Sequence, residues 1–169
     1  MSTTDYINPF KQAIMNRFHE VNADKGHTLP QAWLTPYLSQ HAEHQACFEP
    51  AMQQLQAENL IEYQKTAEGG YHLMLTQQGE DTLYPDFHVT DAKQKIRRDI
   101  FAKFKANQDK TITDFWLSTY FGRLNPKEQR IFSDVLKGML TENLVITSLL
   151  QSFYYLTEKG EHLMRESLV

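Results

Sequence analysis

The sequence predicts a mainly helical α+β protein that carries small β-hairpins, and three observations predict this class. Apolar residues recur at helical spacing in both halves of the chain. Short apolar runs on either side of turn residues predict two hairpins. One stretch also occurs twice, as segments 55–61 with 75–80 and segments 140–145 with 156–161. Each copy reads as a helix end, a strand, a turn, a second strand and a new helix start.

The first half begins with a predicted helix, with Asn8 at its N-cap and Pro9 at its first position. Four apolar residues on one face of this helix should point inward: Phe10, Ile14, Met15 and Phe18. A short extended piece, 27–29, follows. Pro30 then opens a second helix, which Pro36 should shorten or kink.

A third helix should complete the first half, and three of its residues should be buried: Phe48, Met52 and Leu55. Pro50 either interrupts this helix or marks its true start. Asn59 should end it in the left-handed conformation, which asparagine tolerates better than most residues. The strands 60–65 and 71–75 then form a hairpin, and Thr76 caps a last helix.

The second half follows the same order. The inward face of its first helix consists of Ile96, Ile100, Phe101 and Phe104. Asn125 and Pro126 form an N-cap and first-position pair that opens the third helix. The inward residues of that helix are Phe132, Val135, Leu136, Met139 and Leu140. Asn143 should end it, and a hairpin over 144–156 leads to a final helix that Thr157 caps.

These correspondences indicate a duplication rather than chance recurrence. The helix faces, Trp-Leu-x-x-Tyr at 33–37 and 116–120, Glu-Asn-Leu and Leu-Thr-x-x-Gly-Glu recur in one order. The predicted domains are therefore 1–84 and 91–169, joined by a linker at 85–90. Because the linker is short and rich in large residues, we expect the two domains to sit close together.

The order of helix, short strand, two helices and hairpin resembles the winged-helix fold. Segments 55–61 and 75–80 are similar to the end of its third helix and the end of its wing. The resemblance covers nearly the whole chain, once per half, and implies two tandem winged-helix domains. In most DNA-binding winged helices the third helix lies in the major groove and the wing touches the backbone.

Charge separates the two halves. The whole chain carries a formal charge of −4, with −6 in residues 1–85 and +2 in the remainder. The third helix of the first half contains no Lys or Arg, so repulsion from phosphate argues against DNA binding there. The candidate nucleic-acid-binding residues of the second half are Lys93, Lys95, Arg97, Arg98, Lys127, Arg130 and Lys137. The alternative is a solvated helix face with internal pairs such as Asp99–Lys103.

The second wing favours a different partner. Residues 145–157 contain no charged side chain, and the predicted tip is 148–152. An exposed hairpin of this composition is prone to aggregate, so something should cover it. The candidates are the other domain, a second copy of the chain, or another protein. The hypothesis is a protein interface centred on Leu149, Leu150 and Phe153.

The sequence offers little catalytic chemistry. His41, Glu43 and His44 are the one local cluster of metal-ligand residue types. Zinc normally needs a third protein ligand, and the sequence does not place one. We expect these residues to be solvated at a helix start, and we predict no metal and no cofactor. Cys47 lies among apolar neighbours and should belong to the core. No enzyme is expected.

The leading hypothesis is a non-catalytic regulator whose second domain contacts double-stranded DNA. The competing hypothesis is a protein–protein adapter, which would resemble the accessory subunits of chromosome-condensing and endosomal sorting complexes. The N-terminal residues show no signal peptide and no apolar run could span a bilayer, so we expect a cytoplasmic protein that does not enter the membrane.

Overall fold

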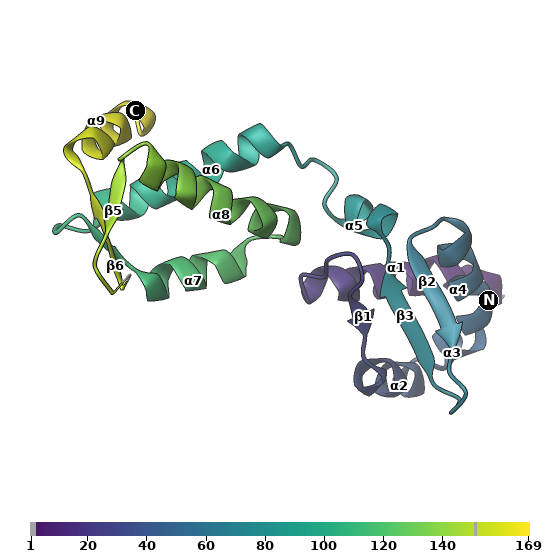
Figure 1. Cartoon of the computed structure of the whole chain (residues 1–169). Coiled ribbons are helices and arrows are strands. Elements are labelled where there is room, and N and C mark those ends of the chain that lie inside the picture. The colour runs from purple at the N-terminus through teal and green to yellow at the C-terminus, as the bar shows by residue number, and fades with distance from the viewer. Residues whose placement is uncertain (1–2, 151) are drawn as a thin grey trace. The chain divides into compact units, whose positions relative to one another are not determined.

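The computed structural model describes residues 3–150 and 152–169, and the chain divides into two compact units. We call them unit 1 (Met1–Pro85) and unit 2 (Asp86–Val169). Each unit is mixed α and β and contains one three-stranded antiparallel sheet (Figure 1). Within the described ranges, no helix is both long enough and apolar enough to cross a membrane.

From the first α-helix onward, the elements follow a similar order in both units. Those of unit 1 are η1 (Thr3–Tyr6), α1 (Ile7–Glu20), β1 (Thr28–Leu29), α2 (Gln31–Gln40), α3 (Ala42–Ala46), α4 (Phe48–Ala57), β2 (Ile61–Lys65), β3 (Tyr71–Leu75) and α5 (Gln77–Leu83). Those of unit 2 are α6 (Val89–Ala106), β4 (Thr111–Thr113), α7 (Asp114–Arg123), α8 (Pro126–Thr141), β5 (Val145–Thr147), β6 (Phe153–Leu156) and α9 (Glu158–Ser167). The long helix α8 therefore stands where unit 1 has the two helices α3 and α4.

The two sheets share one topology. Strand order is β1-β3-β2 in unit 1 and β4-β6-β5 in unit 2. The last strand of each hairpin is therefore central, and it pairs with the short strand that follows the first helix. Leu29 lies opposite Leu73 in unit 1, and Ile112 lies opposite Tyr154 at the matching place in unit 2.

Each unit has its own hydrophobic core, as the helical spacing predicts. The predicted inward residues of α1 and α6 are all buried: Phe10, Ile14, Met15, Phe18, Ile96, Ile100, Phe101 and Phe104. On α8, Val135 and Met139 are buried, while Phe132, Leu136 and Leu140 are partly buried against the same core. The tryptophan and tyrosine of each Trp-Leu-x-x-Tyr also pack against a core while remaining partly buried.

The repeated Glu-Asn-Leu ends a helix in the same way in both units. Asn59 and Asn143 each adopt a left-handed backbone with a φ of 56°, which confirms the prediction. The next residue closes the helix, because the N–H of Leu60 donates to the carbonyl of Leu55 at 2.9 Å. The N–H of Leu144 does the same to the carbonyl of Met139 at 2.9 Å. In each unit this hydrogen bond satisfies a carbonyl that would otherwise lack a partner at the helix end.

The repeated Leu-Thr-x-x-Gly-Glu fixes the last helix of each unit against this closed end. The Thr157 hydroxyl accepts from the N–H of Gly160 at 3.0 Å and donates to the carbonyl of Leu144 at 3.0 Å. Thr76 makes the matching bonds in unit 1. A Cβ on Gly160 would lie 2.0 Å from the Leu144 oxygen, and one on Gly79 would lie 2.1 Å from the Leu60 oxygen. Only glycine fits at these two places.

Three predictions about helix limits need correction. The first helix begins at Ile7, preceded by η1, so Asn8 and Pro9 lie inside its first turn instead of at its cap. Helix α2 continues through Pro36 to Gln40 and is not shortened there. Pro50 neither interrupts nor starts α4 but lies in its first turn, where a backbone N–H has no helical partner to lose.

Candidate functional site: the basic helices and the hairpin of unit 2

Two of the predicted DNA-contacting side chains are held by carboxylates of their own unit. The Lys95 ammonium lies 2.7 Å from the carboxylate of Glu128, at the start of α8. The Arg97 guanidinium donates two hydrogen bonds, of 3.2 and 2.8 Å, to Glu142, the residue after α8. The two bases stand two residues apart on α6 but reach opposite ends of α8. Each of these two bases therefore bridges α6 to the region of α8 and already faces a carboxylate of its own unit.

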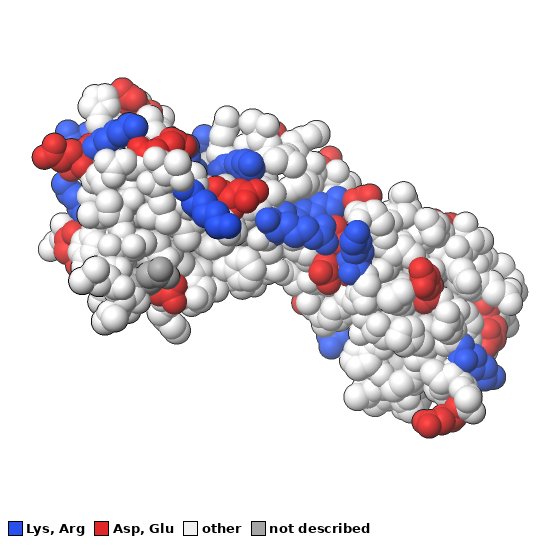
Figure 2. All heavy atoms as spheres, viewed as in Figure 1, with Lys and Arg blue, Asp and Glu red and all other residues white. Residues whose placement is uncertain are grey.

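The other five predicted DNA-contacting side chains differ from one another in their contacts. Lys127 extends over the ring of Phe87 at 5.7 Å, and both it and Arg130 have further contacts within the chain. Lys93, Arg98 and Lys137 are exposed and form no ion pair with any residue that the structure describes. On the face of unit 2 seen in Figure 2, blue cations and red carboxylates are intermixed rather than gathered into a continuous basic surface.

The suggested Asp99–Lys103 pair does not form among the described residues. The Tyr120 hydroxyl donates to Asp99 at 2.7 Å, and the Lys103 ammonium lies 5.9 Å from the ring of Trp116. Burial and the bond to Asp99 raise the pKa of Tyr120 well above its ordinary value. Asp99 therefore accepts a hydrogen bond from Tyr120 and does not pair with Lys103.

A cation, a tryptophan and a tyrosine stack in this order in both units. In unit 2 the Trp116 and Tyr120 rings are 5.2 Å apart at an angle of 14°. In unit 1 Arg17 lies 5.5 Å from the Trp33 ring, which stacks on Tyr37 at 5.0 Å. We did not predict this stack. Its signal in the sequence is the repeated Trp-Leu-x-x-Tyr together with a cation just before the last inward phenylalanine of the first helix.

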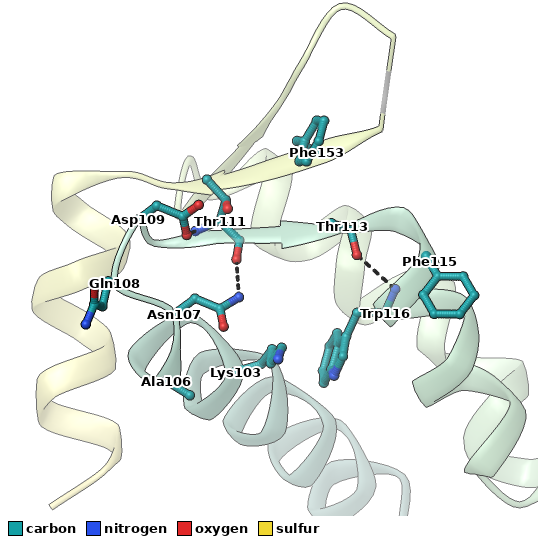
Figure 3. A pocket seen from close by; sticks show the side chains of 10 residues that line it. All are labelled: Lys103, Ala106, Asn107, Gln108, Asp109, Thr111, Thr113, Phe115, Trp116 and Phe153. Carbon is teal, nitrogen blue, oxygen red and sulfur yellow. Dashed lines mark hydrogen bonds between the residues drawn. The ribbon is translucent and has the colours of Figure 1, made fainter.

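The stack of unit 2 borders a shallow hollow between the end of α6, β4 and the start of α7 (Figure 3). In Figure 3, Trp116 points back toward Lys103, whereas Phe115 points the opposite way, away from Lys103. Phe115 also borders a second hollow with Leu150 and Phe153 of the hairpin. The N–H of Asp114 donates to the carbonyl of Ser152 at 3.1 Å, which ties the start of α7 to the hairpin.

The predicted protein interface lies on the surface of unit 2. Leu149 and Leu150 are 105% and 87% exposed, Phe153 is 44% exposed, and Gln151 of the tip lies outside the described residues. Phe115, 80% exposed, adds a large aromatic ring beside Leu150 and Phe153 that sequence reasoning did not assign to this surface. We call Phe115, Leu149, Leu150 and Phe153 the apolar patch.

The outward face of the second hairpin differs from that of the first. In unit 2, Ile146 lies opposite Tyr155, and both side chains are exposed. The matching pair in unit 1 joins Glu62 to Met74, and Glu62 is exposed. Charged side chains protect an edge strand from pairing with other chains. The first hairpin has that protection and the second lacks it.

The cluster of His41, Glu43 and His44 lies where α2 ends and α3 begins. His44 is buried and packs on Phe10 at 5.0 Å, so the expectation that it is a solvated residue is wrong. Burial lowers the pKa of His44. A hydrogen bond from its own backbone N–H lowers the pKa of Glu43. Cys47 is buried as expected, and burial raises the pKa of its thiol.

No protein-family model matches the chain, and no curated protein matches its sequence.

Proposed function

We propose that the chain is a non-catalytic adapter built from two winged-helix domains, and that the hairpin of unit 2 joins two copies of it. The observation that carries this proposal is the apolar patch, which leaves two leucines almost fully in contact with water. Large apolar side chains gathered on the surface of a folded unit, as Phe115, Leu150 and Phe153 are around one hollow, are typical of an interaction site. The winged-helix assignment rests on the element order and on the sheet topology that both units share.

A second copy of the chain is the partner that this surface suits. Strand β5 is at the edge of its sheet, so the backbone on its outer side is free to pair with another strand. Two antiparallel copies of β5 would meet across a two-fold axis without any like charges, because residues 145–157 carry none. Strand β2 would bring two copies of Glu62 together in the same arrangement, and like charges disfavour such pairing.

The energetics are those of a reversible dimer. Removing Leu149 and Leu150 from water contributes about 3–5 kcal/mol per copy before the costs of association are subtracted. Because association costs take up much of this gain, we expect a weak homodimer whose population rises with protein concentration.

The test is the mass of the full chain in solution, measured by sedimentation at increasing concentration. We expect the wild type to approach twice the monomer mass, and the double variant Leu149→Ser with Leu150→Ser to remain monomeric. Val89→Ser is the matched control, because Val89 is a half-exposed apolar residue of unit 2 outside the hairpin. A wild type that is monomeric throughout, or a double variant that still dimerises, would refute the proposal.

DNA binding through unit 2 is the second candidate function. It is favoured by Lys93, Arg98 and Lys137, which are exposed and have no ion pair with a described residue. It is disfavoured by the pairing of Lys95 and Arg97, since a cation that already holds a carboxylate releases fewer counterions from DNA.

Retention of the chain on a random-sequence DNA duplex, at low and at moderate salt, tests this candidate. The change Lys93→Glu with Arg98→Glu alters exposed residues and spares the Arg97 pair that holds α6 to α8. A DNA-binding unit 2 should show retention that falls steeply with salt and is lost in this variant, while Lys65→Glu in unit 1 has no effect. An absence of retention at low salt would eliminate DNA as a partner.

A further inference from the structure

A break between two helices gathers three metal-ligand residues in unit 1, away from the surfaces described above. His41 ends α2 with a non-helical backbone, φ −127° and ψ 76°, and α3 begins at the next residue. The carbonyl of His41 accepts from the N–H of His44 at 3.0 Å, which closes the turn. The imidazole rings of His41 and His44 lie next to each other across this turn, with their centres 5.3 Å apart.

The ligand atoms of His41, Glu43 and His44 all lie within 4.8 Å of one another. The carboxylate of Glu43 is 3.5 Å from Nδ1 of His41. Ligands of a tetrahedral zinc ion, with bonds of about 2.0–2.1 Å, stand about 3.3 Å apart. The side chains of His41 and Glu43 are each 40% exposed, so they can rotate to close the difference. Because a ring nitrogen binds an ion in the plane of its ring, the His41 ring must turn out of its stack on His44 when the ion binds.

The third ligand residue is held in place by a neighbour. The Tyr37 hydroxyl lies 2.8 Å from Nδ1 of His44, and Phe10 packs on the ring. Nε2 of His44 has no hydrogen bond to any described residue. A histidine that uses one ring nitrogen for a fixed hydrogen bond and keeps the other for an ion is the usual arrangement at metal sites.

We propose that His41, Glu43 and His44 bind a divalent first-row transition ion such as Zn²⁺. Two imidazoles and one carboxylate suit zinc better than calcium or magnesium, which prefer oxygen ligands only. Water would complete the coordination. The bound ion would fasten the end of α2 to α3, and so to α1 through Phe10. The site is independent of the hairpin and of dimer formation.

The experiment is a calorimetric titration of the untagged full chain with Zn²⁺ alone, repeated with Co²⁺ to record its visible spectrum. We expect one ion per chain, the visible bands of tetrahedral Co²⁺, and a higher melting temperature for unit 1. His41→Asn and Glu43→Gln should each weaken Zn²⁺ binding at least tenfold. Tyr37→Phe, which removes the supporting hydroxyl and keeps the ring, should weaken it about tenfold or more.

His162→Asn is the matched control, because His162 and Glu166 on α9 stand 3.5 Å apart but form only a two-residue pair. It should bind Zn²⁺ like the wild type. Equal affinity in the wild type and His41→Asn, or a loss of binding in His162→Asn as large as in His41→Asn, would overturn the proposal. Circular dichroism distinguishes loss of a ligand from loss of the fold, and Glu43→Gln removes the carboxylate ligand without changing either histidine.

Discussion

Arg97 and Glu142 join the middle of α6 to the residue that follows α8, across 45 positions of sequence. Both guanidinium bonds go to the one carboxylate, and the same guanidinium lies 5.9 Å from the ring of Phe101. A two-pronged arginine pair has more geometric specificity than a single contact. Arg97, one of the predicted DNA-contacting residues of α6, therefore links two elements of its own unit.

A double-mutant cycle measures how strongly Arg97 and Glu142 interact. Arg97→Gln, Glu142→Gln and the combined variant should give a coupling energy of about 0.5–1 kcal/mol, since both side chains are partly exposed. Urea unfolding followed by the fluorescence of Trp116, in a Trp33→Phe background, reports on unit 2 alone. A coupling energy of zero at low salt would show that the pair has no stabilising effect.

The glycines of the repeated motif should be intolerant of any side chain. Gly160→Ala places a methyl group against the Leu144 carbonyl, so we expect it to destabilise unit 2 by about 1–3 kcal/mol. Gly138→Ala is the control, because its Cβ would meet only the end of Glu142 at 3.8 Å. That change should stabilise α8 by about 0.5–1 kcal/mol. Similar unfolding midpoints for the two variants would contradict the packing described here.

The start of α8 depends on a reciprocal cap. Asn125 accepts from the N–H of Glu128 at 2.9 Å, and Glu128 accepts from the N–H of Asn125 at 3.1 Å. Asn125→Ala should cost about 1 kcal/mol in the free energy of unfolding. Glu128→Gln keeps an acceptor for the cap but loses the charge that faces Lys95, so its cost should be smaller. Thermal unfolding of the two variants orders these costs, and the reverse order would be evidence against the cap.

Tyr120 makes unit 2 sensitive to alkaline pH. Because the pKa of Tyr120 in the folded chain is raised above its ordinary value of 10.0, its stabilising effect is complete below pH 10 and is lost as pH rises further. Tyr120→Phe should cost about 0.5–1.5 kcal/mol at pH 7, and the difference from wild type should shrink above pH 10.

Urea unfolding at pH 7, 9 and 10.5 measures this difference, with Tyr155→Phe as the control because the Tyr155 ring is 40% exposed. A constant gap between wild type and Tyr120→Phe at all three pH values would contradict the role given to the Asp99 bond.

The sequence alone was enough to predict the mixed α+β class, the inward faces of α1 and α6, and the asparagines that end α4 and α8. These features depend on spacing and on contacts within a few residues, so the local sequence is enough to predict them. The early start of α1 was missed because a short 3₁₀ turn leaves little periodic signal.

Only the tertiary structure decided which charges and rings meet. Lys95 and Glu128 are 33 residues apart, and the angle at which α6 crosses α8 brings them together. The same holds for Phe115 beside the hairpin, and for His44, which a break between two helices turns onto Phe10. Sequence spacing describes the face of one helix. Contact between elements depends on how those faces pack, and packing involves both partners at once.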